Sequence, residues 1–434
     1  MRGQKEDLVE AETHLVKVYS LLPEKDVVRP FADPSQPETL FWYEKVILAL
    51  AHRVHGYLRR VQGLMKDAVA QYQKAATLLR EIDLRIEMAA VSNDMGFAQA
   101  ELGEYHDGRA NVLHALKLRK DLGRRVPVAL SLNTLAAIDV REGRYREARQ
   151  NSERALSIFR VFVPPRGIGL ALITLAEATR RYAGTEPLLA LDERIDLLRR
   201  ARDHAREAQS LFTGTGESSR LVEASIEIGC ACRDLVWWLK MSPWPGDDIE
   251  RTFKESWDAL TQAAKLAQEN GLTYRHMDAL VNRAWLEYYR LESEEKALDS
   301  LYVRIDETEK IFPTDNEMDK QPQVWAQKGK LYVLKGHLVR RLLEQQRKIE
   351  PKGISDKIEF ALKEIAENYA HGLEFSGKFS FDYQGIRQAK DSVSEKLKDL
   401  NASEMRIVCN QVKSLYPEGS VIQTFLTNRA LWQE

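Results

Sequence analysis

The stretch "NDMGFAQAELGEYHDGRANVLHALKL" (93–118) aligns without a gap on "NTLAAIDVREGRYREARQNSERALSI" (133–158), forty residues further along the chain. The residues that coincide at this offset include Asn93 with Asn133, Gly96 with Ala136, Gly103 with Gly143, and Tyr105 with Tyr145. A fixed period of this size indicates a repeat architecture, in which each unit buries its apolar face against its neighbours. The same frame reaches back to Gly56 and forward to Ala176.

The coincident residue types suit pairs of antiparallel helices. A small residue such as Gly96 or Ala136 lets the first helix of a pair approach the second closely. Gly103 and Gly143 fall where one helix must end and the backbone must take a positive φ. Apolar residues between these positions follow a helical period, and no segment alternates as a strand does. The sequence therefore predicts an all-α protein.

The pattern resembles the tetratricopeptide repeat (TPR), with a small residue, a turn glycine, a tyrosine and two alanines on the second helix. Ala148 and Ala155 are the two alanines in one unit. The resemblance covers roughly residues 46–345 and is strongest over 90–160. It implies a right-handed α-solenoid, the TPR superhelix, closed by helical caps. The usual unit has about 34 residues, and the longer unit here is similar to TPR arms of bacterial signalling and regulatory proteins.

Changes in the period suggest how the chain is organised. The predicted parts are an N-terminal helix and Pro-rich loop (1–45), the repeats (46–345) with insertions at 182–193 and 237–248, and a C-terminal helical region (346–434). The helix expected at 5–22 resembles the second helix of a pair, so it is interpreted either as a cap or as the end of a longer array.

The resemblance implies that the first helix of each pair lines a concave groove and that groove asparagines bind the backbone of an extended peptide. The groove candidates are Arg53, Tyr57, Asn93, Phe97, Asn133, Glu177 and Trp285. Two interpretations stay open for Asn93 and Asn133, because each could bind a peptide or tie neighbouring repeats together. Tyr57 and Phe97 could likewise contact a ligand or pack between repeats.

Tryptophans gather at the second insertion. Trp237, Trp238 and Trp244 are candidates for a protein interface, because exposed aromatic residues often dominate binding energy. The alternative is core packing, since Trp237 and Trp238 still belong to the end of a helix.

The segment "GLEFSGKF" (372–379) contains most of a phosphate-binding loop. Phe379 stands where such a loop needs a Ser or Thr hydroxyl for magnesium. The segment also follows a helix and not a strand, so Gly372 and Gly377 are expected to end that helix. No nucleotide cofactor is expected.

Composition and charge argue against several classes of protein, namely nucleic-acid binders, metalloproteins, membrane-spanning proteins and secreted proteins. The 64 basic and 65 acidic residues give a net charge of −1, which argues against a general nucleic-acid binder. Three cysteines suit a reducing compartment, and neither they nor the histidines show metal-site spacing. No apolar run is long enough to span a membrane, and the N-terminus does not resemble a signal peptide. A cytoplasmic protein without a metal is expected.

These observations predict a non-catalytic scaffold that binds a protein or peptide, as a sensor or adaptor in a bacterial regulatory system. The alternative is a transcription or nucleic-acid-associated regulator that uses the repeats as its ligand-sensing arm. That alternative lacks a recognition helix with clustered base-reading residues.

Overall fold

The computed structural model describes residues 5–21, 41–162, 164–242, 249–291, 295–349, 355–379 and 384–427. Every regular element in these ranges is a helix, so the predicted all-α class is confirmed. The helices are α1 (Lys5–Leu21), α2 (Trp42–Val61), α3 (Met65–Glu81), α4 (Arg85–Glu101), α5 (Tyr105–Asp121), α6 (Arg125–Arg141), α7 (Tyr145–Phe162), α8 (Pro165–Thr185), α9 (Leu191–Thr215), α10 (Ser218–Leu239), α11 (Ile249–Glu269), α12 (Thr273–Arg290), α13 (Glu295–Lys310), α14 (Asp315–Lys320), α15 (Gln323–Ile349), α16 (Asp356–Phe379), α17 (Gln384–Leu397), α18 (Ala402–Leu415) and α19 (Val421–Thr427).

Regular helix and turn lengths explain the forty-residue period. Helices α3 to α6 each have 17 residues, and three-residue turns such as 102–104 and 122–124 join them. A helix and its turn thus take twenty residues, and a pair takes forty. The unit is longer than the usual TPR because its helices are longer.

Gly103 and Gly143 lie in the turns that end α4 and α6, where a positive φ was expected. Gly103 and Gly143 have φ values of 82° and 79°, in the left-handed region that favours glycine. The Gly103 amide donates to the Ala100 carbonyl at 3.1 Å, and the Glu104 amide donates to the Gln99 carbonyl at 3.0 Å. These bonds satisfy carbonyls that the helix end would otherwise leave free. The expected role of the turn glycines is confirmed.

Small residues bring the paired helices into backbone contact. A Cβ atom on Gly96 of α4 would lie 2.5 Å from the Gly108 carbonyl oxygen of α5. At Gly56 of α2, a Cβ atom would lie 2.7 Å from the ring of Tyr72 on α3. Ala136 of α6 is completely buried at the equivalent place. The pattern of small residues therefore sets the distance between the helices of each pair.

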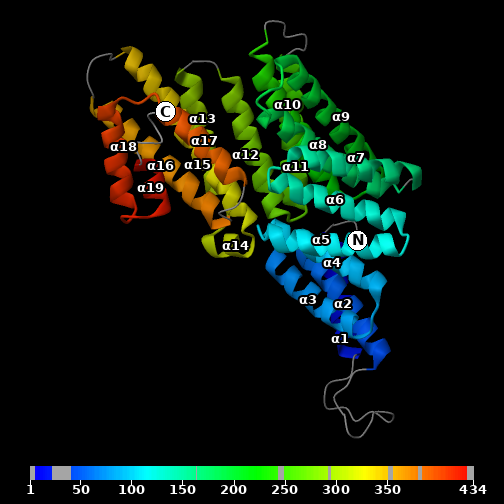
Figure 1. Ribbon diagram of the computed structural model, residues 1–434. Coiled ribbons are helices and arrows are strands. Elements are labelled where there is room, and N and C mark those ends of the chain that lie inside the picture. The colour runs from blue at the N-terminus through cyan, green and yellow to red at the C-terminus, as the bar shows by residue number, and fades with distance from the viewer. Residues whose placement is uncertain are drawn as a thin grey trace. The chain divides into compact units, whose positions relative to one another are not determined.

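Packing divides the chain into two units. Unit 1 comprises Met1–Glu186, Arg200–Glu227 and Leu266–Leu272, and unit 2 comprises Pro187–Arg199, Ile228–Lys265 and Thr273–Glu434. In unit 1 the pairs α2–α3, α4–α5 and α6–α7 follow one another as consecutive layers (Figure 1). Buried alanines and larger apolar residues fill the layers, among them Tyr72 and Phe159.

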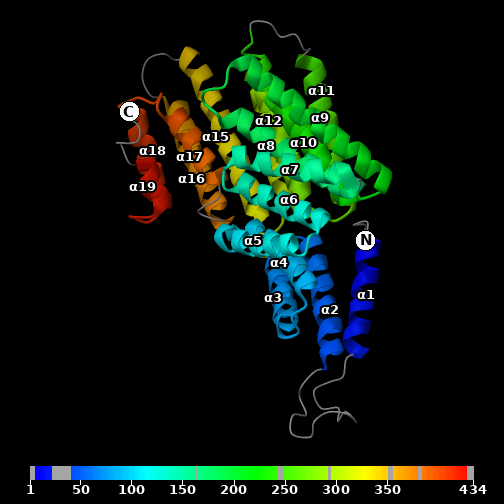
Figure 2. The same cartoon turned by 45° about the vertical axis from the view of Figure 1, so that its right-hand side comes forward.

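Helix α1 packs beside α2 at the start of unit 1 (Figure 2). The Tyr19 hydroxyl lies 3.2 Å from His52 Nδ1 and 3.4 Å from His55 Nδ1. Both histidines of α2 therefore contact the neighbouring helix α1.

In unit 2, the long helices α15 and α16 form the main pair, and α17, α18 and α19 pack on α16. The prediction that Gly372 and Gly377 end a helix is wrong, because α16 continues through both to Phe379. Gly372 is needed for close packing, since a Cβ atom there would lie 2.8 Å from Val333 Cγ2 and 3.1 Å from the Gly329 carbonyl oxygen of α15. Lys378 Nζ lies 3.9 Å from the ring centroid of Trp325.

Among the helices described here, none combines the length and apolar character needed to cross a membrane.

Candidate functional site

An arginine lies between two aromatic rings on the first helices of unit 1. The Arg60 guanidinium of α2 is 4.9 Å from the ring centroid of Tyr57 and 5.1 Å from that of Phe97 on α4. The Arg141 guanidinium of α6 also lies 5.7 Å from the ring centroid of Phe97. We call Tyr57, Arg60, Phe97 and Arg141 the aromatic–arginine cluster. It links three successive first helices.

Arg60 differs from its neighbours in having no carboxylate partner. Its Nε is buried without a hydrogen-bond partner, and no ion pair of Arg60 is found in the part of the chain that the structure describes. By contrast, Arg53 pairs with Glu87 at 3.0 Å and Asp94 at 3.3 Å. Burial lowers the pKa of Arg60, but Tyr72 and Asp94 raise it, and on balance the pKa is raised. A charged guanidinium without a carboxylate partner among the described residues thus lies at the cluster, with its Nε buried.

Tyr57 and Phe97 were predicted from the sequence as groove residues, but Arg60 was not. The forty-residue alignment could have identified Arg60, because the equivalent residues in the next two units are the apolar Ala100 and Val140. A charged residue at an otherwise apolar repeat position was visible in the sequence. Arg141, which pairs with Glu101 of α4, was also missed. The groove candidates were taken only from the residue three before each small residue and the residue directly after it, and Arg141 is at neither position.

Asn93 ties neighbouring repeats together. Its Oδ1 accepts hydrogen bonds from Arg119 Nη1 of α5 at 3.2 Å and from Ser131 Oγ of α6 at 3.1 Å. Arg119 Nη1 also donates to the Pro127 carbonyl at 3.0 Å. Burial lowers the pKa of Arg119 to about 10, so the guanidinium remains charged at neutral pH. These hydrogen bonds are of the kind expected for a tie between repeats, one of the two interpretations that the sequence left open.

Asn133 occupies the equivalent position one unit later but has no such network. Its Oδ1 accepts no hydrogen bond from the described residues. The register explains the difference, because Phe159 stands where the preceding unit has Arg119, and Ala171 where it has Ser131. The Asn133 side chain is half-exposed although its Oδ1 is buried, so a bond to another molecule would be donated by its Nδ2.

The other groove candidates lie in different surroundings. Glu177 is 3.9 Å from Arg181 on its own helix α8, and both are half-buried. Trp285 belongs to unit 2, where its ring meets those of Tyr288 and His337 edge-on, with centroids 5.8 and 5.7 Å apart.

The tryptophans expected at an interface make internal contacts. Trp237 lies against Tyr289, with ring centroids 5.0 Å apart. The Arg194 guanidinium lies 4.4 Å from the ring centroid of Trp238. Both tryptophans are half-buried, whereas Trp244 lies outside the described residues.

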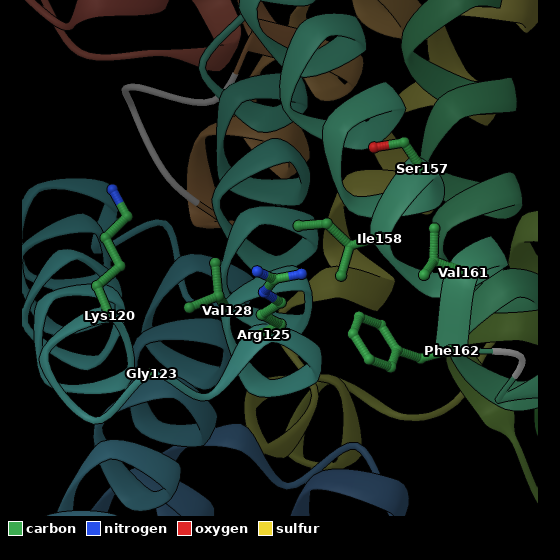
Figure 3. Close-up of a pocket in the computed structure, with 8 residues that line it drawn as sticks. All are labelled: Lys120, Gly123, Arg125, Val128, Ser157, Ile158, Val161 and Phe162. Carbon is green, nitrogen blue, oxygen red and sulfur yellow. The ribbon is translucent and has the colours of Figure 1, made fainter.

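A pocket of about 580 Å³ opens between the turn after α5 and the end of α7 in unit 1. Its lining residues are Lys120, Gly123, Arg125, Val128, Ser157, Ile158, Val161 and Phe162. Figure 3 shows Ile158 and Phe162 extending from α7 towards Arg125 and Val128 at the start of α6. Four apolar side chains, of Val128, Ile158, Val161 and Phe162, line the pocket together with the cations Lys120 and Arg125. Sequence analysis did not identify it.

No group of three or more His, Cys, Asp or Glu side chains in the described ranges is placed to hold a metal ion.

The comparisons with known proteins concern the repeats. A tetratricopeptide repeat family model matches residues 87–160. No curated protein matches the chain in sequence.

Solved structures with related helical arrangements share little sequence with this chain. Aspartyl phosphate phosphatase F from Bacillus subtilis is 12% identical with a TM-score of 0.44, over 88% of this chain and 82% of that one. A Rap protein complexed with competence and sporulation factor is 13% identical with a TM-score of 0.43, over 90% and 99% of the two chains. The apo form of RapI is 11% identical with a TM-score of 0.39, over 80% and 99%.

At such values these structures do not indicate what this chain binds. The family match has a firmer basis, because residues 87–160 include the turn glycines and the Gly96 contact described above. The same register continues into α2 and α8 on either side. Residues 87–160 of this chain are tetratricopeptide repeats.

Proposed function

We propose that this protein is a non-catalytic scaffold that binds a protein or peptide partner through the aromatic–arginine cluster and Asn133. The observation that supports the proposal most is Arg60, a guanidinium between two rings without a carboxylate partner in the described chain. A carbonyl or carboxylate of a partner would satisfy it, and Tyr57 and Phe97 would supply apolar contact. Arginine and tyrosine are the residue types that most often dominate binding energy.

A role as a sensor or adaptor in a bacterial regulatory system rests on the resemblance of the forty-residue unit to the TPR arms of such proteins. In this role the repeats hold the binding residues in place. Each of Tyr57, Phe97 and Arg141 sits on a helix whose position is fixed by close pair packing, so little ordering is needed on binding.

The two equivalent asparagines provide a matched test of this proposal. Asn133→Ala is expected to weaken binding of a partner captured from the host by roughly fivefold, the effect of losing one hydrogen bond worth about 1 kcal/mol. Its thermal midpoint is expected to stay near the wild-type value, because Asn133 Oδ1 has no internal partner. Asn93→Ala is expected to lower the free energy of unfolding by about 1–3 kcal/mol, because a buried arginine loses a partner.

Affinity and thermal stability are measured on the same two purified variants. The reverse pattern, in which Asn133→Ala loses stability and keeps its affinity, would contradict the proposal.

A further inference from the structure

Two ion pairs at equivalent positions link the ends of consecutive helix pairs in unit 1. Lys45 Nζ near the start of α2 lies 2.7 Å from Glu81 Oε2 at the end of α3. Forty residues later, Arg85 Nη2 at the start of α4 lies 3.9 Å from Asp121 Oδ2 at the end of α5. The two pairs occupy the same place in successive repeats, because antiparallel pairing sets the start of the first helix beside the end of the second.

The third pair, α6–α7, keeps the cation and lacks the acid. Arg125 begins α6 at the position of Arg85, but Val161 stands near the end of α7 where the register expects the equivalent of Asp121. Arg125 consequently forms no ion pair with any described residue, and neither does Lys120 at the end of α5. The pocket of about 580 Å³ lies at this break in the series.

The same change makes the pocket apolar. Val161 is 72% exposed and Phe162 is 47% exposed, so two neighbouring apolar side chains face solvent at the pocket. Ile158 and Val128 continue the apolar surface inwards (Figure 3). The volume lies within the range of about 300–1,000 Å³ that is typical of ligand sites.

We propose that this pocket binds a segment of a partner protein in which a bulky apolar side chain is flanked by carboxylates. The apolar side chain packs on Phe162 and Ile158, and a carboxylate pairs with Arg125 in place of the acid that the two preceding repeats carry themselves. Lys120 attracts a second carboxylate of the same peptide. The open rim, with Val161 and Phe162 in contact with solvent, suits a side chain presented by a peptide and not an enclosed small molecule.

This inference goes beyond the proposed function, because the pocket shares no residue with the aromatic–arginine cluster or Asn133. The two sites can therefore be tested separately. Failure of one leaves the variants of the other with their own expected results.

The test uses the full chain with labelled Ile, Leu and Val methyl groups and three probes. Two synthetic peptides share one aromatic and two leucine residues, flanked in one peptide by glutamates and in the other by lysines. The third probe is decanoate, a free amphiphile. The acidic peptide is expected to shift the methyl signals of Val128, Ile158 and Val161 saturably, and the basic peptide to bind at least about tenfold more weakly. Equal binding of both peptides, binding of decanoate alone, or no shift at millimolar acidic peptide would overturn the proposal.

Val161→Asp supplies the missing acid and tests the mechanism. The new carboxylate is expected to pair with Arg125 and repel the acidic peptide, which weakens peptide binding about tenfold while the thermal midpoint is kept or raised. Val303→Asp is the matched control, because Val303 is 56% exposed on α13 in unit 2. It adds the same charge and is expected to leave peptide binding unchanged. Unaltered peptide affinity in a folded Val161→Asp protein would refute the assignment of the carboxylate to Arg125.

Discussion

Gly96→Ala is expected to lower the free energy of unfolding of unit 1 by about 1–3 kcal/mol, although alanine favours a helix over glycine by about 1 kcal/mol. The added methyl group would lie 2.5 Å from the Gly108 carbonyl oxygen and 2.7 Å from Val112 Cγ2. The carbonyl belongs to the backbone of α5, so relief requires the two helices to move apart. A larger residue at position 96, such as leucine, is expected to lower the free energy of unfolding further than alanine does.

Gly184→Ala is the matched control. Gly184 lies in the last turn of α8, and nothing lies within 4 Å of a Cβ atom built there. The same substitution is therefore expected to be neutral or to stabilise by up to about 1 kcal/mol. Urea denaturation of the two variants measures both effects. If Gly96→Ala were as stable as Gly184→Ala, close packing of α4 on α5 would not be what holds the pair together.

Acid is expected to destabilise unit 2 through His337 of α15. Its ring nitrogens lie 2.8 Å from the Tyr369 hydroxyl and 2.7 Å from the Ser392 hydroxyl. Burial, helped by the charges of Lys396 and Arg341, lowers its pKa from 6.5 to about 3. Because the folded-state pKa is depressed, the unfolded chain takes up the proton first as the pH falls. Neutral His337 therefore makes its full contribution to the free energy of unfolding above about pH 6.5. Below that pH the contribution falls by about 1.4 kcal/mol per pH unit.

Between pH 6.5 and pH 4, protonation of His337 in the unfolded chain is expected to lower the free energy of unfolding by about 3 kcal/mol. His337→Gln keeps a donor and an acceptor but does not titrate, so its acid sensitivity should be smaller by about that amount. His106→Gln is the control, because the His106 side chain is 98% exposed. Urea unfolding at both pH values decides the matter, and equal acid losses in wild type and His337→Gln would contradict the mechanism.

The fold was predictable because its signals are local and repeat. A glycine that must adopt a positive φ, such as Gly103, recurs at a fixed interval, and a small residue such as Gly96 precedes it by seven positions. The error at Gly372 has the same physical origin. A helical glycine can serve close packing as well as helix termination, and only the neighbouring helix α15 shows which role applies.

The candidate sites were less predictable because they depend on departures from the repeat. Asn93 and Asn133 are identical in the pattern, yet their surroundings differ through Arg119 and its equivalent Phe159, which lie on other helices. The pocket likewise arises where Val161 replaces an acid. Comparing each position with its equivalents in neighbouring units, and not only with its own helix, would have found Arg60 and Val161.

Site-specific photocrosslinking tests the central claim most directly, which is that the first helices of unit 1 bind a partner. A benzophenone amino acid replaces Phe97 in one variant and Phe360, which is 69% exposed on α16, in a control variant of the same chain. Both are incubated with the partner, and the crosslinked product is quantified after denaturing electrophoresis. Strong crosslinking from position 97 with little from position 360 is the predicted result. Crosslinking from position 360 alone, or none from position 97 while the complex remains intact, would contradict the account.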